Sequence, residues 1–119
     1  MTALLFLAVS VAGGVGAACR FMLDGVIRAA ASTRLPVATA TINISGSFAL
    51  GMLVGLAVPS SLLLVAGTGF LGGYTTFSTA SYETVRLMQD RAWGHALVTG
   101  FGVLAAATAA AAAGLYLGS

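Results

Sequence analysis

Charge is confined to two short parts of this chain, and everything between them is apolar. All eight charged residues lie within residues 20–34 and 83–91. A helix needs about 20 apolar residues to cross the hydrocarbon core of a bilayer. Four segments meet this requirement, and they run from about Ala3 to Cys19, Val37 to Val58, Leu62 to Tyr82 and Trp93 to Leu117. Because only helices satisfy their own backbone in lipid, the sequence predicts a single all-α transmembrane domain, residues 1–119, with four helices.

Composition supports a multi-pass protein of the cell membrane and excludes several other classes. The chain is 59% hydrophobic and 7% charged, whereas soluble domains carry about 25% charged residues. Its five basic residues are all arginine and are too few for a nucleic-acid-binding surface. The single Cys19 excludes an internal disulfide and a cysteine-based zinc site. His95 is the only histidine, and no set of side chains suggests an enzyme.

Small residues mark where the helices are expected to touch. Gly51 and Gly55 form a small-xxx-small pair in the second segment, and Gly13 with Ala17 forms another in the first. Such pairs let helix backbones approach closely in lipid. The alanine run at residues 105–113 indicates close packing in the fourth segment as well. Four short helices cannot enclose a wide pore, so a channel or transporter of this length must form oligomers.

Two polar features lie at membrane depth. Asn43 stands about 10 Å along the second segment at 1.5 Å per residue. Its amide either makes an interhelical hydrogen bond or donates to an anion in a pore. In the third segment, Gly72 and Gly73 precede Tyr74, Thr75 and Thr76, which makes a poor helix. The alternatives there are a helix broken near mid-membrane beside a cavity and a merely kinked packing helix.

Three ordered motifs together resemble one known family. These are residues 13–20 (GGVGAACR), residues 41–48 (TINISGSF) and residues 68–79 (TGFLGGYTTFST). They are similar to the motifs of the Fluc/CrcB fluoride channels, and the likeness extends over the whole chain. The resemblance implies an antiparallel dimer with two pores along its interface and passive export of fluoride, which confers fluoride resistance.

The resemblance also implies site residues and a cofactor. The fluoride pore would include Asn43, Phe77, Ser78 and Thr79. Phe77 would present its ring edge, the positive part of an aromatic ring, to the anion. A structural sodium ion would be held by the backbone carbonyls of Gly72 and Thr75.

Two alternatives to a self-sufficient channel remain. The family usually has a second phenylalanine where this chain has Ala80, so the chain could be a non-conducting partner subunit of a heterodimeric channel. A small multidrug-type transporter has similar length, but that mechanism needs a carboxylate within the membrane, and the first segment has none.

The arginines predict the topology. The loops after the first and third segments lie on one side and hold all the basic residues (Arg20, Arg28, Arg34, Arg86 and Arg91), while the other side has none. The positive-inside rule therefore places both termini outside the cell. A homodimer of antiparallel subunits requires insertion in both orientations, so this bias favours a heterodimer with a related subunit of opposite topology over a homodimer.

Overall fold

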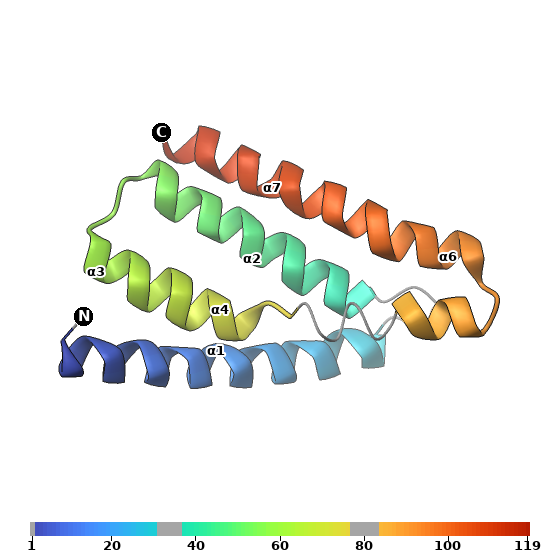
Figure 1. Ribbon diagram of the computed structural model, residues 1–119, viewed down its shortest axis with the longest axis horizontal. Coiled ribbons are helices and arrows are strands. Elements are labelled where there is room, and N and C mark those ends of the chain that lie inside the picture. The colour runs from blue at the N-terminus through green and yellow to red at the C-terminus, as the bar shows by residue number, and fades with distance from the viewer. Residues whose placement is uncertain (1, 31–36, 77–83) are drawn as a thin grey trace.

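The computed structural model describes residues 2–30, 37–76 and 84–119, which form an all-α bundle. Figure 1 shows the helices running up and down along one long axis, with both termini at the same end. The third crossing, Ser60–Tyr74, is one helical run with a π-helical middle. The fourth crossing, Trp93–Gly118, has the same composite form. The helices are α1 (Ala3–Ala30), α2 (Val37–Gly55), then α3 (Ser60–Leu62), η1 (Leu63–Leu71) and α4 (Gly72–Tyr74), and finally α6 (Trp93–Leu97), η2 (Val98–Gly102) and α7 (Val103–Gly118). Residues 84–89 form a further short helix.

Three helical runs are long and apolar enough to cross a membrane: Ala3–Ala30, Val37–Gly55 and Trp93–Gly118. Ser60–Tyr74 is apolar but shorter. At 1.5 Å per residue it covers roughly 22 Å, less than the hydrocarbon core of about 30 Å. The rest of the predicted third segment includes residues 77–83, which lie outside the described residues.

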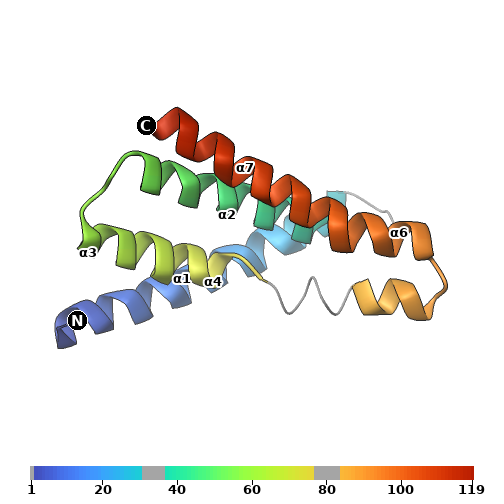
Figure 2. The same ribbon diagram turned by 45° about the horizontal axis from the view of Figure 1, so that its top comes forward.

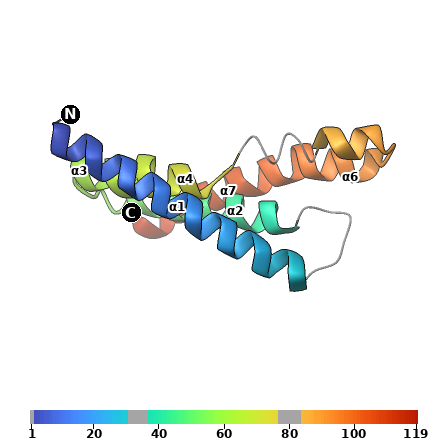
Figure 3. The ribbon, with the colours of Figure 1, turned by 90° about the horizontal axis from the view of Figure 1, so that it is seen from below.

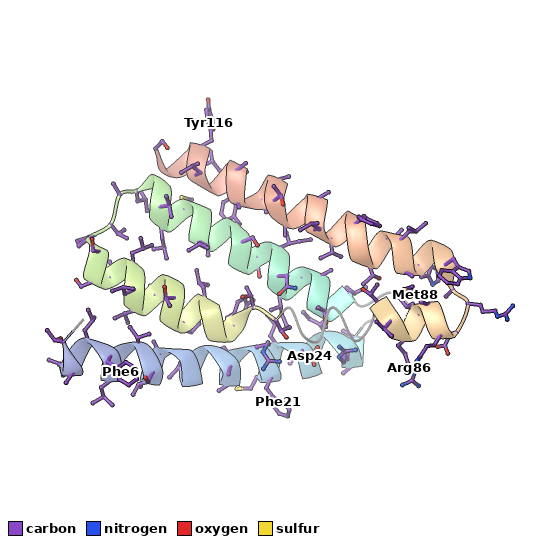
Figure 4. All side chains as sticks on the ribbon, in the orientation of Figure 1. Phe6, Phe21, Asp24, Arg86, Met88 and Tyr116 are labelled. Carbon is purple, nitrogen blue, oxygen red and sulfur yellow. The ribbon has the colours of Figure 1, made fainter. Side chains whose placement is uncertain are left out.

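Large apolar side chains cover the outside of this bundle. Phe6 and Phe21 on α1 are 65% and 77% exposed, and Tyr116 on α7 is 81% exposed. Figure 4 shows all three pointing away from the helices that they neighbour. In water such a surface would be strongly unfavourable. It is the surface expected where lipid is the solvent, and it confirms the multi-pass membrane protein indicated by composition.

The first helix is longer than the sequence predicted. We expected it to end at Cys19, before the charged residues, but α1 continues to Ala30. No proline interrupts this stretch. The Arg28 Nε donates a 2.8 Å hydrogen bond to the Asp24 carboxylate one turn earlier, an i,i+4 pair worth about 0.3–0.5 kcal/mol. Arg20, Asp24 and Arg28 therefore belong to the helix rather than to a loop.

Two tight helix pairs make up the bundle, and glycine permits both. A Cβ at Gly51 of α2 would collide with the Ala111 carbonyl oxygen of α7, and one at Gly114 of α7 would collide with the Phe48 carbonyl oxygen. The predicted packing roles of Gly51 and of the alanine-rich fourth helix are confirmed. In Figure 2, α2 and α7 lie side by side over most of their length.

The second pair joins α1 to the third crossing. A Cβ at Gly16 would collide with the Phe70 carbonyl oxygen, and one at Gly73 with the Gly13 carbonyl oxygen. Gly14, by contrast, has no atom of this chain near its Cβ position. Seen from below, α1 is the outermost layer, in front of the third crossing (Figure 3). The predicted contact at Gly13 is confirmed, and its partner is the third crossing.

These contacts predict opposite effects for two identical substitutions. Gly51→Ala should destabilise the protein by about 1–3 kcal/mol, because the new methyl group overlaps the α7 backbone. Gly14→Ala should leave stability unchanged or raise it by up to about 1 kcal/mol, since alanine is the better helix former. Thermal unfolding in detergent, followed by the monodisperse fraction that remains after heating, measures both. Equal losses from the two substitutions would contradict the packing described here.

Candidate functional site

The third crossing stops being helical at Thr75. Thr75 adopts an extended conformation, with φ −81° and ψ 157°, directly after the last helical residue, Tyr74. The Thr75 backbone N–H and hydroxyl both donate to the Leu71 carbonyl, each at 2.9 Å. These two bonds close the last turn.

The break falls within the run from Gly72 to Thr76 that the sequence marks as a poor helix. It lies near the end of that run, because Gly72 and Gly73 are still helical. Gly73 lies directly against the α1 backbone at Gly13, and this contact explains why a glycine is needed within the helical part. The poor helix propensity of this run correctly indicated an interrupted helix, while Gly73 itself serves helix packing.

Asn43 of α2 holds the chain immediately after the break. Its Oδ1 accepts a 2.9 Å hydrogen bond from the Thr76 N–H, and its Nδ2 donates at 3.1 Å to the Thr76 carbonyl. The carboxamide thus pairs with one residue's backbone as a neighbouring strand would. Because the N–H can meet only the oxygen and the carbonyl only the nitrogen, the amide orientation is fixed.

Arg20 of α1 approaches the same break from the other side. Its Nε donates to the Gly73 carbonyl at 3.4 Å. The last carbonyls of a helix have no intrahelical donor and carry partial negative charge, so a cation near them is favourable. In the sequence Arg20 is the last residue of a family motif and one of the arginines that indicate topology, whereas its contact with the third crossing is visible only in the fold.

A glycine in α2 gives the break room. A Cβ at Gly46 would collide with the Thr75 methyl group and would lie 3.2 Å from the Tyr74 ring. The Tyr74 hydroxyl shares a 3.0 Å hydrogen bond with the Ser45 hydroxyl. The Tyr74 ring also stacks on Phe70, with ring centroids 6.0 Å apart. Tyr74, the last helical residue, is therefore held by Ser45 of α2 and by Phe70 one turn earlier.

Beside the break lies a groove of about 610 Å³ between α2, the third crossing and the fourth. Its polar lining consists of one amide and several hydroxyls, and its apolar lining comes mainly from leucine and glycine. The polar residues are Asn43, Ser47, Thr75, Thr76, Thr84 and Thr99. Thr99 is 5% exposed, and its hydroxyl has no hydrogen-bond partner within the described residues. No charged side chain lines this groove among those residues.

The structure brings together three of the residues predicted from sequence. Asn43, Gly72 and Thr75 all line the groove. Phe77, Ser78, Thr79 and Ala80 lie outside the described residues. Of the two fourth-helix threonines, Thr99 lines the groove, whereas Thr108 is exposed and donates to the Leu104 carbonyl at 2.8 Å. Thr76, the hydrogen-bonding partner of Asn43, lies in the motif at residues 68–79, and the sequence predicted no role for it.

A polar groove beside a broken membrane helix, with no charged lining, is the kind of site found in small proteins that pass ions across membranes. Comparison with known proteins agrees with that class. Residues 7–115 match the model of the CrcB-like protein, Camphor Resistance (CrcB), family. The chain belongs to the CrcB family, as the three sequence motifs predicted.

Several curated relatives cover most of the chain. A Leifsonia xyli protein named fluoride-specific ion channel FluC 1 is 52% identical over 99% of this chain and 89% of its own length. A Thermobifida fusca protein of the same name is 41% identical over 97% and 93%. A Mycobacterium bovis protein, fluoride-specific ion channel FluC 2, is 43% identical over 82% and 77%.

Gly46 provides a direct test of how the break is held. In Gly46→Ala, the added methyl group should displace Thr75 and weaken the Asn43–Thr76 pair, so exchange of the Thr76 amide hydrogen should accelerate. One net hydrogen bond of about 1 kcal/mol corresponds to roughly a fivefold change. Gly102→Ala is the matched control, because its new Cβ meets only Val98, at 3.7 Å. Hydrogen exchange in detergent micelles measures both, and protection equal to that of the unmodified protein in Gly46→Ala would contradict this arrangement.

Proposed function

We propose that this chain is a subunit of a fluoride-specific ion channel that lets fluoride leave the cell passively. Family membership and the names of its relatives supply the substrate. The observation that carries the proposal is the fixed Asn43 amide at the edge of an uncharged polar groove. The protein acts as a channel rather than an enzyme.

Asn43 has one amide N–H to spare. Nδ2 carries two hydrogens, and one of them is used by the Thr76 carbonyl. Because the amide orientation is fixed, the second N–H is preorganised as a donor for an anion. A neutral donor suits conduction, since an ion must bind well enough to enter and weakly enough to leave. Phe77, Ser78 and Thr79 complete the proposed fluoride pore.

The groove is only partly enclosed by this chain, so a single subunit does not form the proposed pore alone. An antiparallel dimer with pores at its interface would close it and would cover part of the apolar surface. A multidrug-type transporter is disfavoured on the same evidence. Asp24 is the only carboxylate on α1, and it pairs with Arg28 on the exposed helix surface, where it cannot serve as a proton-coupling group within the membrane.

Fluoride flux from liposomes tests this function. Vesicles containing the assembled channel, as a homodimer or together with the related subunit, should release fluoride and retain chloride. Asn43→Ala should reduce the fluoride flux by at least about tenfold, because it removes the proposed donor and both hydrogen bonds between Asn43 and the Thr76 backbone. Ser10→Ala is the control: its hydroxyl donates to the Phe6 carbonyl on the exposed face of α1. Equal release of chloride would refute fluoride selectivity, and full flux from Asn43→Ala would restrict Asn43 to packing.

We also propose a structural sodium ion held by the Gly72 and Thr75 carbonyls of both subunits. These groups fit such an ion, because hard cations prefer oxygen ligands. The Thr76 N–H donates to Asn43 and not to the Gly72 carbonyl, and the extended Thr75 turns its own carbonyl off the helical path. The described residues contain no cluster of His, Cys, Asp or Glu side chains that could hold a metal, so the proposed ligands are backbone carbonyls.

Orientation in the membrane is the remaining part of the proposal. The last turn of α1, which carries Arg28, and the short helix at residues 84–89, which carries Arg86, lie at the end of the bundle opposite both termini (Figure 1). Arg34 lies outside the described residues. Arg20 contacts Gly73 within the bundle and is discounted as a loop residue. The bias that remains still favours one orientation and a heterodimer with a related subunit of opposite topology, in which Ala80 would be tolerated.

Cysteine labelling at the C-terminus tests this orientation. In Ser119→Cys on a Cys19→Ala background, an impermeant thiol reagent added to intact cells should label nearly all of the protein, since the positive-inside rule keeps the arginine-bearing end in the cytoplasm. Ser10→Cys, within the membrane, is the unlabelled control. Half-maximal labelling, or strong fluoride flux from this chain alone, would instead support a homodimer of antiparallel subunits.

A further inference from the structure

The paired hydrogen bonds between Asn43 and Thr76 do more than fix the Asn43 amide. In an uninterrupted helix, the Thr76 N–H would donate to the Gly72 carbonyl four residues earlier. Here it donates to Asn43 Oδ1 at 2.9 Å instead. The bond from the preceding residue, Thr75 N–H to Leu71, is intact at 2.9 Å. The Gly72 carbonyl thus lacks the donor that a continuous α-helix would give it.

The surroundings of Gly72 leave that carbonyl accessible. Gly72 is exposed on the surface of the subunit, and the only atom near its Cβ position is the Gly67 carbonyl oxygen at 3.8 Å. The neighbouring Gly73 carbonyl differs, because it accepts from Arg20 at 3.4 Å. The two carbonyls at the break therefore differ. The Gly73 carbonyl accepts from Arg20, whereas the N–H that would reach the Gly72 carbonyl is bound by Asn43.

We infer that Asn43 is a positioning residue for the sodium site, because it captures the Thr76 N–H and so keeps the Gly72 carbonyl free to bind a cation. The inference rests on the sodium site proposed above. It links the two proposed ion sites: the Asn43 amide that donates to fluoride also keeps the Gly72 carbonyl oxygen available to sodium. Loss of Asn43 lets the Thr76 N–H return to Gly72, where it competes directly with the ion.

Thr76→Pro makes this reasoning testable by rescue. Proline has no N–H, so it cannot donate to Gly72 whether or not Asn43 is present. The residue before a proline must be extended, and Thr75 already is, with ψ 157°. The substitution thus reproduces the one effect ascribed to Asn43 and restores neither its amide nor its pore donor.

The experiment measures sodium-dependent stability rather than flux. The purified full-length protein is unfolded thermally while sodium replaces N-methylglucamine at constant ionic strength. The unmodified protein and Ser10→Ala should be stabilised by sodium. Asn43→Leu should need about tenfold more sodium for the same stabilisation, near the upper limit for one net hydrogen bond. Asn43→Leu with Thr76→Pro should regain the original sodium dependence while its fluoride flux stays low.

The outcomes separate the two proposals. If sodium does not stabilise the unmodified protein, the sodium site itself is refuted, and this inference with it. If sodium stabilises the unmodified protein and Asn43→Leu equally, the site stands and the positioning role of Asn43 is refuted. Should Asn43→Leu fail to fold, Asn43→Ala takes its place: a weaker sodium dependence that Thr76→Pro restores supports the inference, and an unchanged sodium dependence overturns it.

Discussion

The pair of hydrogen bonds between the Asn43 carboxamide and the Thr76 backbone is the interaction on which the site depends. A helix that ends inside a membrane exposes backbone groups that lipid cannot satisfy, at a cost of several kcal/mol each. The bonds at 2.9 Å and 3.1 Å give the first residue beyond the extended Thr75 a partner for both its N–H and its carbonyl. A side chain replaces backbone pairing at the one place where the helix cannot supply it.

Glycine packing brings Asn43 within reach of the break. The third crossing is held against α1 through Gly16 and Gly73, and α2 is held against α7 through Gly51 and Gly114. In lipid, where no hydrophobic effect drives helices together, such close backbone contacts supply much of the association. Gly46 has a different task, since it keeps α2 clear of the Thr75 and Tyr74 side chains. The same small residue type therefore builds the bundle and makes space for its interruption.

The electrostatics of the site suit an anion that must move. In the described residues the groove is lined by an amide, hydroxyls and apolar groups, and it has no charged lining. Arg20 lies nearby, but its Nε is directed to the Gly73 carbonyl at the end of the third crossing. Positive charge is thus used to complement a helix terminus, while neutral donors face the groove. This division is consistent with membership of the CrcB family and with the proposed passive conduction.

Local sequence determined the class of fold and much of its packing. Apolar length and the confinement of charge dictated membrane-spanning helices, because lipid excludes other backbone structures. Small-residue spacing located the contacts at Gly13 and Gly51, and an unusual Gly-Gly-Tyr-Thr-Thr run marked the interrupted helix. The end of α1 was misplaced, because charged residues near a membrane surface can continue a helix as well as end one, and Asp24 and Arg28 do continue it.

Tertiary structure alone decided what Asn43 contacts and where the third crossing stops being helical. Sequence left Asn43 divided between packing and anion binding, since an amide can do either. The fold shows that one of its N–H groups and its oxygen are engaged by Thr76, and an anion contact of the second N–H remains a proposal. Within the run from Gly72 to Thr76 the break falls at Thr75, and Gly73 packs in helical form against Gly13. Both results depend on contacts between residues far apart in the chain, and helix propensity carries no information about such contacts.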